Sequence, residues 1–155
     1  LEVYQSMGLK IKQVSTSSYE FSCTNLKSIK NIKTKEFPGY PTDLQAQLIA
    51  SLLKVGQKSN ITENIFENRF IHIPELRRFG AQLDIVGNTV VINKTNDLFG
   101  AEVMATDIRA SFSLIIAAII SKGTTTINRI YHLDRGYEDF DLKLKKCGVN
   151  IKRKK

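Results

Sequence analysis

The chain has 155 residues, of which 42% are hydrophobic and 25% charged, so it is long enough and apolar enough to bury one hydrophobic core. Its longest apolar run, at residues 114–120, is far shorter than the roughly 20 residues that a membrane-spanning helix needs. The formal net charge of +8 favours anionic partners, but part of it comes from the basic run at residues 152–155, which is more typical of a solvated terminus than of a nucleic-acid-binding arm.

Cysteine and histidine usage argues against a disulfide framework or a zinc site. Cys23 and Cys147 are far apart and form no paired-cysteine motif, and neither His72 nor His132 has a second metal ligand at a suitable spacing. Both histidines lie beside apolar residues, so we expect them to be packing or capping residues. Since no secretory or transit signal is recognisable either, we expect a cytoplasmic protein.

Taken in chain order, residues 1–7 have the pattern of the end of an apolar helix. Apolar periodicity predicts further helices, and β-branched runs between them predict strands. The pair Gly87-Asn88 between two such runs is typical of a β-hairpin turn. The expected helices are residues 43–55, 72–79, 107–121 and 136–147, and the expected strands are residues 60–66, 82–86, 89–93 and 124–130.

Internal repetition organises these elements. Landmarks return along the chain at a spacing of roughly 70 residues, which indicates a repeated structural unit. Three of the recurring glycines follow a helix tail and precede a strand, so each is expected to be a left-handed helix C-cap. The matched positions are Gly8, Gly80 and Gly148, Gly56 and Gly123, Thr42-Asp43 and Thr106-Asp107, and Arg69 and Arg135.

The repeat predicts an α/β (α+β) fold built of βαβαββ units. We expect residues 1–34 to be the tail of a truncated unit with its following strands, residues 35–95 to be a second repeat and residues 96–155 a third. Two full repeats and a tail would leave helices without a full set of neighbours on the sheet. We therefore expect the chain to be a fragment that exposes apolar surface, or that pairs with itself or with the missing portion.

The turn before the second predicted helix is a candidate site. Pro38 and Pro41 favour an extended approach to that helix, so Asp43 is presented at a rigid turn, where a carboxylate could accept a proton from a hydroxyl. Helix capping by Asp43 is the competing interpretation. We expect Thr42 and Thr106 to be N-caps, with Gln45 completing a capping box.

Three arginines, Arg69, Arg109 and Arg135, lie at the ends of predicted elements. Guanidinium groups bind phosphate and carboxylate in forked geometry, so several of them in one cleft would hold a small dianion. Surface salt bridging explains any single arginine equally well, although the recurrence of Arg69 as Arg135 favours a site.

Four motifs, in order along the chain, resemble the enolpyruvyl transferase family, and among its members the UDP-N-acetylglucosamine 1-carboxyvinyltransferases. The resemblance implies an inside-out barrel in which two domains, each of three βαβαββ units, close over the substrates. This chain would be the C-terminal portion, within one catalytic domain whose partner domain is absent. The motifs are FPGYPTDLQAQ at residues 37–47, TENIFENRF at 62–70, ATDIRAS at 105–111 and DRGYE at 134–138.

The resemblance also implies a reaction. The enolpyruvyl group of phosphoenolpyruvate would move to the 3-hydroxyl of UDP-N-acetylglucosamine with release of phosphate, the first committed step of peptidoglycan synthesis, which serves cell wall biogenesis, cell shape and division. No metal, organic cofactor, membrane or nucleic acid is implied. The implied roles are proton removal by Asp43, assistance in proton movement by Asp107, charge compensation by Arg69 and Arg109, backbone contact with the UDP-sugar by Ile65, and phosphoenolpyruvate binding by Arg135.

One part of the family pattern is missing. The reactive cysteine of the family lies on a mobile loop of the other domain, and neither Cys23 nor Cys147 matches it. We therefore expect the 155-residue chain to be inactive without the N-terminal part of the enzyme. Two alternatives stay open: the sibling enzyme that acts on shikimate 3-phosphate, and a non-catalytic RNA-binding βαβαββ module.

Overall fold

A computed structural model describes residues 1–154 of the chain. The helical elements are α1 (Glu2–Ser6), the 3-10 turn η1 (Thr42–Leu44), α2 (Gln45–Leu53), α3 (Ile73–Arg78), α4 (Ile108–Ile120), α5 (Tyr131–Asp134) and α6 (Phe140–Lys146). The strands are β1 (Lys10–Gln13), β2 (Tyr19–Ser22), β3 (Asn31–Lys33), β4 (Ser59–Thr62), β5 (Leu83–Val86), β6 (Thr89–Ile92), β7 (Glu102–Met104) and β8 (Thr126–Asn128).

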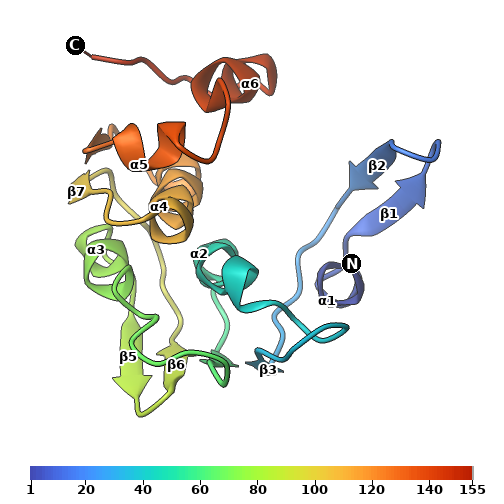
Figure 1. Cartoon of the computed structure of the whole chain (residues 1–155). Coiled ribbons are helices and arrows are strands. Elements are labelled where there is room, and N and C mark those ends of the chain that lie inside the picture. The colour runs from blue at the N-terminus through green and yellow to red at the C-terminus, as the bar shows by residue number, and fades with distance from the viewer. Residues whose placement is uncertain (155) are drawn as a thin grey trace.

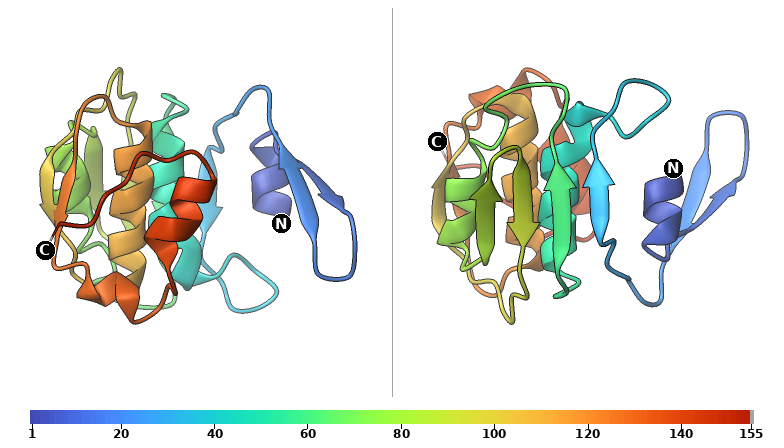
Figure 2. Two further views of the ribbon diagram at one scale, coloured as in Figure 1. Left: turned by 90° about the horizontal axis from the view of Figure 1, so that it is seen from above. Right: turned by 90° about the horizontal axis from the view of Figure 1, so that it is seen from below.

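The strands form three groups. A four-stranded sheet has the order β3-β4-β6-β5, in which β3 and β4 are parallel and the other neighbours antiparallel. The short strands β7 and β8 pair in parallel, and β1 and β2 form an antiparallel hairpin. Helices α2 and α4 lie side by side across one face of the four-stranded sheet, whereas the β1–β2 hairpin extends away from the body (Figures 1 and 2).

The core lies between these helices and the sheet. Leu48 and Leu52 of α2, Leu114 of α4, and Ile61 and Ile92 of the sheet are almost completely buried. Burying each aliphatic side chain contributes about 1.5–3 kcal/mol, so this layer fixes how α2 and α4 sit against each other. A smaller cluster, formed by Ile115, Leu133 and Phe140, attaches α5 and α6 to the outer side of α4.

The predicted α/β fold is confirmed, and residues 31–92 run in the order β3, α2, β4, α3, β5, β6, which is one βαβαββ unit. Gly8, Gly80 and Gly148 have φ values of +94°, +89° and +88°, so each adopts the left-handed conformation expected of it. The hairpin prediction is also correct, since β5 and β6 pair on either side of Gly87-Asn88. Among the described residues, 149–154 form no strand after α6.

Three helix predictions agree with the structure to within a few residues, but the last one is wrong at its start. The sequence predicted a helix over residues 136–147, whereas α6 begins at Phe140 and the short helix α5 precedes it. Asp139 has a φ of +47°, in the left-handed region, and this conformation interrupts the helical path. The predicted strand over residues 60–66 ends at Thr62.

Both N-cap predictions are wrong. Asp107, not Thr106, caps α4, and its Oδ1 accepts hydrogen bonds from the amides of Arg109 and Ala110, both at 2.8 Å. Thr42 opens η1, and its hydroxyl donates to Glu63 Oε2 at 2.7 Å instead of accepting an amide. Gln45 is buried within α2 and completes no capping box.

Both histidines are packing residues, as expected. His72 precedes α3, is 1% exposed, and its Nε2 has no hydrogen-bond partner among residues 1–154. Burial disfavours the imidazolium and lowers the pKa of His72 to about 4, although the nearby charge of Asp107 acts in the opposite direction. His132 packs against the ring of Tyr131, with ring centroids 4.2 Å apart.

Among residues 1–154, no helix combines the length and the apolar character that crossing a bilayer requires.

The cap assignment predicts different effects for two substitutions of Asp107. Asp107→Ala removes the acceptor for two amides and should lower the free energy of unfolding by about 1 kcal/mol, whereas Asp107→Asn, which caps about as well, should change it by only a few tenths. Urea denaturation of both variants measures this difference. Equal losses for the two variants would contradict the cap.

The buried His72 predicts a pH dependence of stability. Its pKa in the folded chain, about 4, is below the usual 6.5, so the unfolded chain takes up the proton first as the pH falls. The contribution of neutral His72 is therefore fully present above pH 6.5 and is lost between pH 6.5 and about 4, by roughly 3 kcal/mol. His72→Gln should flatten the plot of unfolding free energy against pH in this window. Parallel plots for the two proteins would refute the assignment.

Candidate functional site

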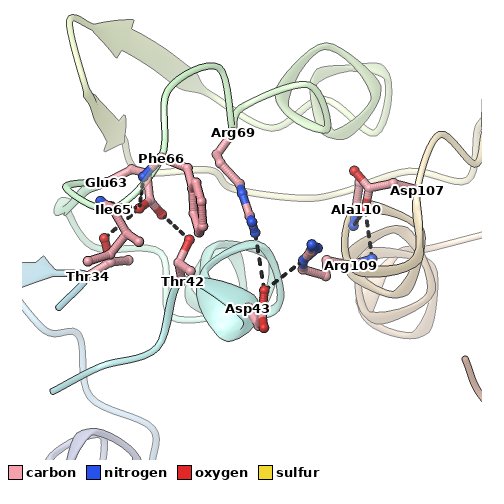
Figure 3. Close-up of polar contacts among 10 residues, drawn as sticks. All are labelled: Thr34, Thr42, Asp43, Glu63, Ile65, Phe66, Arg69, Asp107, Arg109 and Ala110. Atoms are coloured by element: carbon pink, nitrogen blue, oxygen red, sulfur yellow. Dashed lines mark hydrogen bonds and ion pairs between the residues drawn. The ribbon is translucent and has the colours of Figure 1, made fainter. Parts of the chain in front are cut away.

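The site is centred on the carboxylate of Asp43 in η1. Its Oδ1 accepts a hydrogen bond from Arg69 Nη1 at 3.2 Å and one from Arg109 Nε at 2.9 Å. Arg69 comes from the loop between β4 and α3, and Arg109 from the first turn of α4 (Figure 3). Three segments that are distant in the sequence therefore bring one carboxylate and two guanidinium groups together. Within residues 1–154, Asp43 accepts hydrogen bonds from these two arginines and from no helix amide, so it is not a capping residue.

Local structure explains how these side chains meet. Pro41 has an extended conformation, with φ of −73° and ψ of 138°, and the chain turns directly into η1 after it. Because α2 and α4 pack side by side, the turn that precedes α2 lies next to the first turn of α4. The Asp107 cap fixes the backbone of that first turn, from which the Arg109 side chain extends.

The three groups differ in exposure. The Asp43 side chain is 68% exposed, while those of Arg69 and Arg109 are 22% and 40% exposed. Ion pairs of this kind contribute only about 0–1 kcal/mol to stability, so the cluster is not needed to hold the fold together. Two guanidinium groups around one carboxylate leave an excess of positive charge and N–H donors that could bind an anionic ligand.

A buried acid that sequence reasoning missed, Glu63, lies beside this cluster. Its carboxylate accepts four hydrogen bonds, and the residue is 2% exposed. Burial alone would raise the pKa of Glu63, but the hydrogen bonds from Thr42, Ile65, Thr34 and Phe66 outweigh it and hold the pKa below its usual value. The signal in the sequence is weak: Glu63 directly follows a β-branched strand, but it shares the TENIFENRF motif with a second acid, Glu67.

Ile65 and Arg69 line a pocket of about 780 Å³ that extends from Glu63 to Ile71 and reaches the β5–β6 hairpin at Gly87 and Asn88. The Ile65 amide donates to Glu63 Oε1 at 2.8 Å. Its carbonyl accepts no hydrogen bond from residues 1–154, so a ligand in this pocket could donate to it.

Arg135 is not part of the Asp43 cluster. It follows α5 and lines a second pocket, of about 720 Å³, together with Asp134, Asp141 and Arg153. Within residues 1–154 no hydrogen bond or ion pair joins Arg135 to Asp43. Of the six residues singled out in the sequence, the structure brings Asp43, Arg69 and Arg109 into direct contact and places Asp107 and Ile65 beside them. Arg135 makes no polar contact with Asp43, but its neighbour Gly136 lies against Ile108, the first residue of α4, which precedes Arg109.

Both cysteines, Cys23 and Cys147, are free and exposed, and neither lines one of these pockets. In the described part of the chain, no three His, Cys, Asp or Glu side chains lie close enough together to hold a metal ion.

Comparison with known proteins relates this arrangement to one family. The family model described as EPSP synthase (3-phosphoshikimate 1-carboxyvinyltransferase) matches residues 1–144. The UDP-N-acetylglucosamine 1-carboxyvinyltransferase of Pelagibacter ubique is 50% identical over 155 residues, which are 99% of this chain and 36% of that protein. The enzyme of the same name from Rhodopseudomonas palustris (strain TIE-1) is 56% identical over 122 residues, which are 79% of this chain and 28% of the relative.

Comparison with solved structures gives the same family. An enolpyruvyl transferase from Streptomyces tendae superposes with a TM-score of 0.82 at 25% identity, covering 97% of this chain and 35% of that one. The EPSP synthase from Acinetobacter baumannii superposes with a TM-score of 0.75 at 16% identity, covering 99% and 36%, and shows the same fold. The chain thus spans about a third of the length of the relatives it matches, and it belongs to the EPSP synthase family of carboxyvinyl transferases.

Proposed function

We propose that this chain is part of an enzyme that transfers the enolpyruvyl group of phosphoenolpyruvate to the 3-hydroxyl of UDP-N-acetylglucosamine. The observation that carries the proposal is the convergence of Arg69 and Arg109 on Asp43. It is supported by the 50% identity to a relative named for this activity. Since the chain covers 36% of that relative, the rest of the enzyme is the expected partner of this segment.

Asp43 is proposed as the base. While Oδ1 accepts from the two arginines, Oδ2 accepts no hydrogen bond from residues 1–154 and can take the proton of a substrate hydroxyl. The freed oxygen then forms a bond to C2 of phosphoenolpyruvate as C3 gains a proton. In the second step C3 loses a proton and the C2–O bond to phosphate breaks, which releases inorganic phosphate and restores the double bond.

The other candidate residues are proposed in supporting roles. Arg69 and Arg109 would offset the negative charge of the substrates and of the tetrahedral addition product, an effect that is typically worth about 3–4 kcal/mol per donor. Asp107 would assist proton movement through Oδ2, which accepts no hydrogen bond from the described residues. Ile65 would contact the UDP-sugar through its carbonyl, and Arg135 would bind phosphoenolpyruvate.

The substrate alternative is shikimate 3-phosphate, which the description of the matching family model favours. Identity favours the nucleotide sugar, because the relatives at about 50% identity carry that name, whereas the EPSP synthase structure is 16% identical. Membership of a family of transferases removes the basis for an RNA-binding module. We place the reaction in the cytoplasm, at the first committed step of peptidoglycan synthesis.

A full-length chimera tests the proposal. Residues 1–155 replace the matching segment of the Pelagibacter ubique enzyme, and phosphate release from phosphoenolpyruvate is measured with either acceptor. We expect turnover with UDP-N-acetylglucosamine and none with shikimate 3-phosphate. Asp43→Asn should lower kcat by about 100-fold to 10,000-fold, because it removes the base.

A matched control is available in Asp97, which is also exposed and ion-paired, to Lys122 at 2.8 Å, but lies outside the site. Asp97→Asn should leave kcat within about twofold of the parent chimera. The 155-residue chain alone should release no phosphate. Turnover with shikimate 3-phosphate, or full activity of the Asp43→Asn chimera, would overturn the proposal.

A further inference from the structure

We propose that Glu63 is a positioning residue. It would fix the position of the base Asp43 relative to residues 64–66, the loop proposed to contact the nucleotide sugar and called the nucleotide-sugar loop below. It would act by holding its neighbours in place through two backbone amides and two threonine hydroxyls. The kinetic part of this inference rests on the proposed function, and its structural part does not.

The two oxygens of Glu63 serve different parts of the site. Oε1 accepts hydrogen bonds from the amides of Ile65 and Phe66, at 2.8 and 3.2 Å, and from the hydroxyl of Thr34 at 2.8 Å. Oε2 accepts from the hydroxyl of Thr42 at 2.7 Å. One carboxylate therefore holds the loop that carries Ile65 with one oxygen, and the turn that carries the base with the other (Figure 3).

A second chain of contacts connects the same two parts. The guanidinium of Arg69 lies over the ring of Phe66, 4.4 Å from its centroid, and donates to Asp43 Oδ1. Thr42, Asp43, Arg69, Phe66 and Glu63 thus form a closed ring of neighbours. A displacement of Glu63 would therefore move both the loop that carries Phe66 and the turn that carries Asp43.

The chemistry of this position calls for an acceptor for the two amides and a hydrogen-bonding group toward Thr42. Four donors point at the two oxygens of Glu63, and a buried donor that is left without an acceptor costs about 1–3 kcal/mol. Glutamine would conserve this network, because its oxygen can accept from the Ile65 and Phe66 amides while its NH₂ group donates to the Thr42 hydroxyl, which accepts as well as donates. Glu63→Leu removes both acceptors at similar side-chain size, so it should free both the loop and the turn.

Three threonine variants separate positioning from simple stabilisation. Thr42→Val removes the single hydrogen bond to Oε2. Thr34→Val removes one hydrogen bond to Oε1 and also the acceptor of the Asn64 amide, at 2.8 Å. Thr89→Val is the matched control. It removes a hydroxyl–hydroxyl contact, 2.9 Å long, with Thr62, the last residue of β4 and the neighbour of Glu63 in the chain, and it leaves the hydrogen bonds of Glu63 intact.

Kinetics of these variants in the full-length chimera test the functional part. Thr42→Val should lower kcat about tenfold with little change in the KM for UDP-N-acetylglucosamine, because it moves the base. Thr34→Val should raise that KM several-fold with little change in kcat, because it loosens the loop. Thr89→Val should lower only the thermal midpoint. If all three variants lose stability alike and none changes kcat or KM, Glu63 is an anchor of the fold and the inference fails.

A second measurement does not depend on the reaction. In NMR spectra of the 155-residue chain, the amide signals of Thr42, Ile65 and Phe66 should shift together on acidification, with one midpoint below the usual pKa of a glutamate, and should no longer do so in Glu63→Gln. Independent titration of the three amides would contradict the inference. If the amides titrate together but the chimera shows no activity, the positioning role of Glu63 stands and the proposed function is rejected.

Discussion

The contact between Asp43 and Arg109 depends on how α2 and α4 pack. Asp43 and Arg109 are 66 residues apart in the chain, yet Nε and Oδ1 are 2.9 Å apart, because the two helices that they precede or begin lie side by side on the sheet. The apolar faces of these helices, with Leu48, Leu52 and Leu114, fix this geometry. The candidate chemistry is therefore a consequence of core packing, while the exposed ion pairs add little stability of their own.

Asp43 and Glu63 differ in burial and in hydrogen bonding, and this difference suits them to different roles at the site. Asp43 is largely exposed and has one oxygen without a hydrogen bond from residues 1–154. Both features are needed in a group that exchanges protons with a ligand. Glu63 is buried and fully hydrogen-bonded, and its four partners keep it ionised, so it is suited to hold neighbours in place. The same carboxylate therefore limits the conformational freedom of residues 64–66 and of the turn that carries Asp43.

The features that could be predicted from the sequence are those that repeat along the chain or have a strong apolar periodicity. The helices α2 and α4, the glycine C-caps and the β5–β6 hairpin follow from apolar spacing and glycine positions, and the repeat drew attention to Asp43, Asp107 and Arg69. Neither threonine is an N-cap, because the Thr42 hydroxyl donates to Glu63 and because Asp107, not Thr106, accepts the amides at the start of α4. The hydrogen-bonding role of Glu63 could not be predicted from its position in the motif, because its hydroxyl partners Thr34 and Thr42 are 29 and 21 residues away. The interruption before α6 depends on one left-handed residue, Asp139, that no pattern indicates.

The shared carboxylate is tested most directly by a double-mutant cycle on kcat/KM in the full-length chimera, with Asp43→Asn, Arg109→Ala and the double variant. If Arg109 acts through Asp43, the double variant should be about as impaired as the more impaired single variant, so that the coupling is at least tenfold, or about 1.4 kcal/mol. Effects that multiply, with no coupling between the two positions, would show that the two residues act independently and would contradict the site described above.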